Sequence, residues 1–183
     1  MIRRAFLGVV VAMPAGMAQA QDMFAAKPIV NAVREGDDEK VRQALLKGEN
    51  PNQNDTSGRP LLMVAVMGGQ IAVAETLLKG GAAVDAADRE GYTALFQAAQ
   101  RGDSELVDIL LKRNAKPNLQ NRQGVTALMV ASRGGYDDIV RALLARKADP
   151  NTADFTGRTA VAYARQSGHT TIAAMLRKAG GRE

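Results

Sequence analysis

The chain has 183 residues, of which 46% are hydrophobic but only 4% are aromatic, and its formal net charge is +5. This length suits one folded unit, and with so few aromatic side chains its core has to be built from aliphatic and small residues. The absence of cysteine excludes disulfides, thiolate metal sites and cysteine nucleophiles.

The first 20 residues have the pattern of a secretory signal peptide. Arg3 and Arg4 give a positive start, residues 5–13 form an apolar run, and residues 18–20 are a small-x-small cleavage site. The run is too short to span a bilayer. We therefore expect cleavage after Ala20, a periplasmic or secreted protein, and no membrane span in the mature chain. The arginine pair also resembles the twin-arginine export motif, so that route and the general secretory (Sec) route both stay open.

After a predicted flexible lead at residues 21–27, the chain repeats itself with a fixed period. Glycines recur every 33 residues in two series: Gly58, Gly91, Gly124 and Gly157; and Gly36, Gly69, Gly102, Gly135 and Gly168. A period of this length indicates a stacked array of supersecondary units. The repeat domain, residues 28–183, divides into five units at 28–54, 55–87, 88–120, 121–153 and 154–183.

One unit, residues 88–120, shows the local signals most clearly. Residues 88–91 predict a turn, because Asp88 can bond its own backbone and Gly91 supplies a positive φ. Thr93 is placed to cap a short helix, and Gly102 breaks the chain before a second helix. In that second helix the apolar residues 106, 107, 110 and 111 share one face. Each unit is therefore predicted to be a helix pair preceded by a turn.

The end units differ from the middle ones. The first lacks the turn and is more polar at Lys40, although it keeps apolar residues at Leu45 and Leu46. The last has Arg177 where the middle units have leucine. Terminal units have only one neighbour and need a polar outer face, so these changes predict caps.

The repeated motif resembles that of the ankyrin-repeat family. The motif copies are Thr93-Ala-Leu-Phe-Gln-Ala-Ala, Thr126-Ala-Leu-Met-Val-Ala-Ser and Thr159-Ala-Val-Ala-Tyr-Ala-Arg. The family pattern has Pro and His where these copies have Ala and either Phe, Met or Ala. The resemblance covers roughly residues 28–183 and implies an all-α repeat solenoid of about five stacked units. In such a solenoid, helix-turn-helix pairs are joined by β-hairpin loops.

The sequence shows no catalytic, metal-binding or phosphate-binding motif. His169 follows Gly168 where the family often has histidine at the start of a second helix, and no nucleophile is set beside it. The paired acids at residues 37–38 and 137–138 fit helix starts. We therefore expect a protein that is not an enzyme and needs no cofactor or metal.

The resemblance implies a partner-binding face on the hairpin tips and first helices. By register, the candidate residues are Arg59, Met67, Arg89, Glu90, Tyr92, Gln100, Arg101, Arg122, Gln123, Arg133, Phe155 and Arg158. Arginine and tyrosine are enriched at binding hot spots, so one hypothesis is a protein partner with an acidic surface. The other is that these arginines only keep the array soluble. We expect a monomer on its own and no nucleic-acid partner.

Three functions are compatible with this sequence. The first is a non-catalytic exported protein-interaction module, of which an inhibitor or immunity protein is one version. The second is an accessory factor that holds an envelope enzyme or a small ligand in stress response or metabolism. It ranks lower because the predicted groove is more charged than apolar. An enzyme ranks last, because no motif supports one.

Overall fold

The computed structural model describes residues 28–182, and in that part of the chain it contains ten helices arranged in five pairs. The signal peptide predicted at 1–20 and the lead predicted at 21–27 lie outside the described residues. The pairs are α2 (Pro28–Glu35) with α3 (Asp38–Leu46), α4 (Leu61–Met67) with α5 (Ile71–Lys79), α6 (Ala94–Arg101) with α7 (Ser104–Lys112), α8 (Ala127–Gly134) with α9 (Asp137–Ala145), and α10 (Ala160–Gln166) with α11 (Thr170–Lys178).

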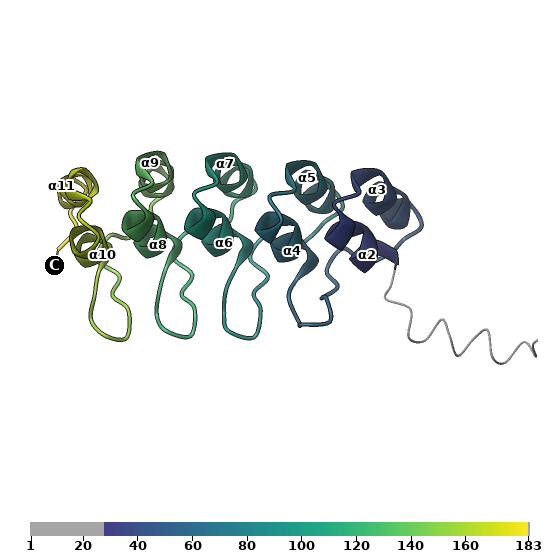
Figure 1. Ribbon diagram of the computed structural model, residues 1–183, viewed down its shortest axis with the longest axis horizontal. Coiled ribbons are helices and arrows are strands. Elements are labelled where there is room, and N and C mark those ends of the chain that lie inside the picture. The colour runs from purple at the N-terminus through teal and green to yellow at the C-terminus, as the bar shows by residue number, and fades with distance from the viewer. Residues whose placement is uncertain (1–27, 183) are drawn as a thin grey trace, which may run out of the picture.

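The pairs stack side by side into an elongated array with two helix layers (Figure 1). The first helices, α4, α6, α8 and α10, form the layer next to the loops, and the second helices form the other layer. The loops project from the first helices on the side away from the second helices. The prediction of an all-α repeat solenoid is therefore confirmed.

The loops are short hairpins without extended strands. Single antiparallel bridges close three of them, between Asn54 and Pro60, Ala87 and Thr93, and Ala153 and Thr159. The fourth, which begins at Asn121, is held by hydrogen bonds across its own turn. None of the described helices combines the length and apolarity that crossing a bilayer requires.

Local capping explains where the first helices begin. The hydroxyl of Thr93 accepts a hydrogen bond from the Phe96 amide at 3.2 Å, and Thr126 caps α8 in the same way. Such caps satisfy amides that have no partner inside the helix. Pro60 takes this position at the start of α4 and supplies no side-chain cap. The predicted role of threonine is therefore confirmed wherever the sequence provides it.

Left-handed residues end the helices and redirect the chain. Gly102 has φ 74° at the end of α6, where an L side chain would be strained. Asn114 and Lys147 adopt φ 62° and 63° after the second helices, at positions where earlier units have glycine. Lysine fits this conformation less well than glycine or asparagine, yet the array imposes it.

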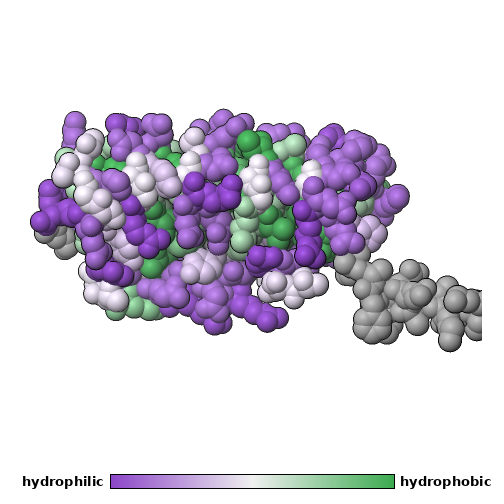
Figure 2. All heavy atoms as spheres, viewed as in Figure 1, coloured by the Kyte–Doolittle hydropathy of each residue, from purple (hydrophilic) through white to green (hydrophobic). Residues whose placement is uncertain are grey.

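The core runs along the whole array between the two helix layers. Leu106, Val107, Leu110 and Leu111 of α7 are all buried, as the helical spacing predicts. Small residues of the first helices, such as Ala98, are fully buried and let neighbouring units approach closely. Figure 2 shows hydrophobic residues between the helix pairs and hydrophilic residues on either side of them. The core is therefore continuous, and each unit depends on its neighbours for burial.

The terminal units have polar outer faces. Lys40 takes the place that Val73 and Leu106 hold in later units, and it pairs with Glu35 at 3.0 Å. Arg177 is exposed at the other end. The apolar side chain of Leu46 does not join the core, because it is 76% exposed. Its register partners are residues 79 and 112, which are solvent-facing lysines.

Asparagine side chains connect each unit to the next behind the hairpins. The side chain of Asn118 accepts from the amide of Asp149 at 2.8 Å and donates to the carbonyl of Lys147 at 3.1 Å. Asn52 and Asn151 make the same pair of bonds with the units that follow them. These bonds fix the register of successive loops.

Candidate functional site

The hairpin face is the surface formed by the hairpin tips and the exposed sides of the first helices, and it contains all twelve residues predicted to contact a partner. Residues 59, 89, 90, 92, 122, 123, 155 and 158 lie in the hairpins, and residues 67, 100, 101 and 133 lie near the ends of the first helices. Their role in binding is a prediction.

Each hairpin is built on one acidic or amide side chain. Asp88 accepts hydrogen bonds from the amides of Glu90 at 2.9 Å and Tyr92 at 3.0 Å. The same two bonds occur at residues 55, 121 and 154. A glycine with positive φ then closes each turn. Because the turns are identical, the array presents its tip side chains at regular intervals.

Two of the predicted partner residues are held inside their own hairpins. Arg59 forms an ion pair with Asp55 at 2.6 Å, and Arg158 pairs with Asp154 at 2.9 Å. Both aspartate side chains are only 2% exposed. A buried carboxylate needs charge-matched hydrogen bonds. We infer that Arg59 and Arg158 serve the hairpin before they can serve a partner.

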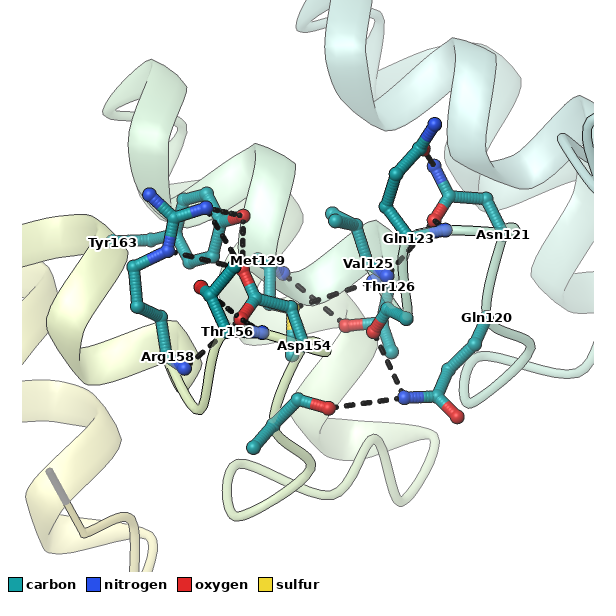
Figure 3. Close-up of polar contacts among 12 residues, drawn as sticks. Gln120, Asn121, Gln123, Val125, Thr126, Met129, Asp154, Thr156, Arg158 and Tyr163 are labelled. Atoms are coloured by element: carbon teal, nitrogen blue, oxygen red, sulfur yellow. Dashed lines mark hydrogen bonds and ion pairs between the residues drawn. The ribbon is translucent and has the colours of Figure 1, made fainter.

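The Asp154 cluster extends into the first helix of the last unit (Figure 3). The hydroxyl of Tyr163 donates to Asp154 at 2.8 Å, and Thr156 donates to the same carboxylate at 2.6 Å. The Arg158 guanidinium also lies 4.9 Å from the centre of the Tyr163 ring. Four side chains therefore satisfy one another, which fixes the hairpin against α10.

Burial and hydrogen bonding act in opposite directions on these carboxyl groups. Burial alone would raise the pKa of Asp154, but the bonds from Thr156, Arg158 and Tyr163 together hold that pKa well below its usual range. Asp55 shows the same balance, and hydrogen bonds from Arg59 and Ser57 lower its pKa. Burial and the bond to Asp154 raise the pKa of Tyr163. Its hydroxyl therefore keeps the proton that it donates.

The two middle hairpins lack the internal ion pair. Asn121 is buried and donates to the side chain of Gln123 at 2.6 Å, with Val125 at the place corresponding to Arg158. In the preceding hairpin, Asp88 is only half-buried, and Tyr92 takes the corresponding place. Arginine therefore occurs in the hairpins whose turn residue is a buried aspartate. It is absent where the turn residue is an asparagine or a partly exposed aspartate.

The other four arginines are exposed but touch the adjoining units. Arg101 donates to the carbonyl of Met67 at 2.9 Å. Arg122 pairs with Glu90 at 3.2 Å, and both side chains are more than half exposed. Arg133 lies over Tyr163 at 5.9 Å, and Arg89 lies against the turn at residue 58 of the preceding hairpin. Exposed contacts of this kind contribute little to stability, so these guanidinium groups can exchange them for a partner.

A shallow pocket lies in the middle of the hairpin face. Its volume is about 220 Å³, and its lining includes Tyr92, Phe96, Gln100 and Arg133. The Tyr92 and Phe96 rings are in contact, with centroids 4.8 Å apart and planes tilted by 52°. The pocket therefore combines an aromatic floor with a cationic edge.

Phe155 is the most exposed aromatic residue of the hairpin tips. It is 76% exposed, and its amide donates to the carbonyl of Gln123 in the preceding hairpin at 3.0 Å. Its ring lies against Gly124, where a Cβ atom would come within 2.8 Å of it. This contact holds an apolar ring out in solvent.

The sequence contained a signal for the internal ion pairs that its interpretation missed. Arginine follows aspartate by four residues at Asp55 and Asp154 but not at Asp88 or Asn121. This co-occurrence within one chain indicates an internal pair rather than a surface charge.

In the part of the chain that the structure describes, no cluster of possible metal ligands accompanies the hairpin face. Within residues 28–182, no three His, Asp or Glu side chains cluster as metal ligands would. His169 precedes α11, and its Nε2 atom lies 3.1 Å from the carbonyl oxygen of Arg133. Its contact is thus with the backbone of the preceding unit.

The comparisons with known proteins agree with this architecture. A family model described as ankyrin repeats in three copies matches residues 29–121 and again residues 95–182. The two matches overlap and together span almost the whole described array. A search of curated proteins found no match.

Proposed function

Because this chain belongs to the ankyrin-repeat family, we propose that it is a non-catalytic, exported module that captures a protein with an acidic surface on its hairpin face. Ankyrin repeats make it a protein–protein interaction module. The nature of the partner, the residues that hold it and the compartment belong to the proposal.

The observation that carries the proposal is the charge of the exposed part of the hairpin face. Arg89, Arg101, Arg122 and Arg133 are all exposed there, and within residues 28–182 Glu90 is the one carboxylate that forms an ion pair with any of them. Complementary charge steers association and selects against wrong partners. A surface with this excess of arginine fits a partner region rich in Asp and Glu.

The aromatic residues supply anchors beside these charges. The pocket floored by Tyr92 and Phe96 can take an apolar side chain, and Arg133 at its edge can pair with a neighbouring carboxylate. Conversely, the exposed ring of Phe155 can insert into a pocket of the partner. Hot spots of interfaces commonly consist of such central aromatic and arginine anchors.

An inhibitor or immunity protein is the specific form of this function that we propose. The hairpins repeat one rigid turn in four successive units, so a bound enzyme would meet an elongated and preorganised face. Preorganisation reduces the entropy lost on binding. Such a face can cover the active-site opening of a toxin or of an envelope enzyme.

Export is supported by the sequence of residues 1–20, which lie outside the described structure. Expression with the native N-terminus should yield a mature protein whose intact mass corresponds to a start at Gln21. A protein that keeps residues 1–20 after export, or stays in the cytoplasm, would contradict this part of the proposal.

The partner can be identified by comparing two variants that remove equal charge. R89A/R101A/R122A alters the hairpin face, whereas R113A/R141A/R146A alters exposed arginines of α9 and of the loops that follow α7 and α9. Captured proteins from the native compartment are then identified by mass spectrometry. We expect one protein that is held by the wild type and the second variant but not by the first, and whose activity is lost on binding. Equal capture by both variants would refute the assignment of the hairpin face.

A further inference from the structure

The loops that follow the second helices carry a separate cluster of cations. Three of these loops, which follow α7, α9 and α11, are residues 113–116, 146–149 and 179–182. Asp149 is the one acidic residue in these loops. Five exposed basic residues lie in them, and we call this cluster the basic edge: Arg113, Lys116, Arg146, Lys147 and Arg182.

Hydrogen bonds between successive units hold the basic edge in a row. Asn118 bonds the carbonyl of Lys147 at 3.1 Å, which ties the first loop to the second. Asn151 accepts from the amide of Arg182 at 3.0 Å, which ties the second loop to the third. The three loops belong to units that follow one another along the array (Figure 1). The loops that carry the cations are therefore arranged along one line.

These cations have no carboxylate partners in the described part of the chain. None of the ion pairs among residues 28–182 includes a member of the basic edge. The first two units differ, because the corresponding loops, residues 47–50 and 80–83, contain one cation, Lys47, and one carboxylate, Glu49. The excess of positive charge in these loops is thus confined to the last three units.

Helix capping accounts for only part of this concentration, since Arg113 and Arg146 are the C-cap residues of α7 and α9. Basic residues in the last turn of a helix favour its macrodipole, and Lys112 and Lys178 already take that position in α7 and α11. Lys116 and Arg182 lie four residues beyond the ends of those helices. Their charges are too far along the chain to belong to the last turn.

The basic edge has no feature that would recognise the shape of a partner. Its three loops contain no aromatic residue on which a nucleic-acid base or a side chain could stack. A row of flexible cationic side chains can bind a flat surface of negative charge, because such binding requires no complementary shape. We propose that the basic edge docks the array on the surface of a bilayer that contains anionic phospholipids.

The expected strength follows from the number of charges. A basic residue near an anionic bilayer raises partitioning roughly five-fold, provided that it lies within a Debye length of the surface. Neutralising three members of the basic edge should therefore weaken binding on the order of 100-fold. Docking through this edge leaves the hairpin face free and does not depend on the partner proposed for that face.

The test is co-sedimentation of residues 21–183, which contain the whole described array, with two kinds of vesicle. One kind is phosphatidylcholine alone, and the other is an equal mixture of phosphatidylcholine and phosphatidylglycerol. The edge variant is K116Q/R146Q/R182Q, and the matched control R89Q/R101Q/R122Q loses the same charge from the hairpin face. The substitutions keep the side chains long and polar, and circular dichroism checks that both variants remain folded.

We expect the wild type and the control to bind the anionic vesicles and not the neutral ones, with binding weakened by salt. The edge variant should show a loss on the order of 100-fold. The proposal is overturned if the wild type does not bind anionic vesicles or if both variants lose binding equally. It is also overturned if a DNA duplex or an acidic polypeptide, at equal total charge, displaces the protein from anionic vesicles more effectively than added phosphatidylglycerol vesicles do.

Discussion

Substituting Gly102 tests how strongly the turns of one unit depend on a side chain from the next. A Cβ atom at Gly102 would lie 2.5 Å from Cε1 and 2.6 Å from Cζ of Tyr136. The ring cannot easily move aside, because its other edge lies against Gly134. Gly168 has a similar φ, 79° against 74°, but no neighbouring atom lies within 4 Å of its Cβ position. The two glycines therefore separate backbone strain from crowding.

The expected magnitudes follow from these two contributions. Alanine in the left-handed conformation costs about 1–2 kcal/mol, which is the whole expected cost of Gly168→Ala. Overpacking adds about 1–3 kcal/mol, so Gly102→Ala should lower the free energy of unfolding by about 2–5 kcal/mol. Urea unfolding followed by circular dichroism measures both changes.

A double-mutant cycle with Tyr136→Ala is the control for this reasoning. In that background the ring is gone, so Gly102→Ala should cost no more than Gly168→Ala does in the wild type. Equal costs of the two glycine substitutions in the wild type would refute the crowding argument. So would an undiminished cost of Gly102→Ala after removal of the ring.

Three further predictions concern the joints between units, the hairpins and the core. Asp85→Asn should raise the free energy of unfolding by up to about 1 kcal/mol in urea titrations. Asp85 already accepts a hydrogen bond from the amide of Lys116 at 2.9 Å, but it has no group that can donate to the Asn114 carbonyl. An asparagine side chain at position 85 could make that second bond. Unchanged stability would contradict it. The folded-state pKa of Asp154 is lowered, so the stability that it contributes is present above about pH 4 and is lost as the pH falls further. Melting temperatures between about pH 7 and about pH 3 should therefore fall more steeply for the wild type than for Asp154→Asn, and parallel curves would be inconsistent with this role. Leu110 is fully buried, and Leu110→Ala should cost about 2–5 kcal/mol. Hydrogen exchange should show faster opening in the third unit and its neighbours than in the end units, whereas a uniform increase along the chain would argue against nearest-neighbour stability.

The features of the fold that depend on local chemistry could be predicted from the sequence. Thr93 and Gly102 act on residues within one turn of themselves, so their roles as cap and chain break could be inferred from position alone. Leu46 shows where the pattern was insufficient. It is apolar and adjacent to a core position, but its register matches lysines that face solvent.

The candidate site was harder to predict because arginine is used there in two ways. Arg59 and Arg89 occupy neighbouring hairpins, and only the four-residue spacing from Asp55 marks Arg59 in the sequence; Arg59 binds a buried carboxylate whereas Arg89 is exposed. The distinction depends on how deeply each aspartate is buried, which is set by packing between units. The bonds of Asn118 to residues 29 and 31 positions later also could not be found, since a period gives spacing but not contacts.

Hydrogen exchange of the complex with its captured partner tests the central claim most directly, which is that the array works through its hairpin face. Binding should slow exchange in the hairpins around residues 89–92, 122–125 and 155–158 and leave α5, α7 and α9 unchanged. Protection confined to the second helices or to the loops that follow them, with the hairpins exchanging as in the free protein, would contradict the account.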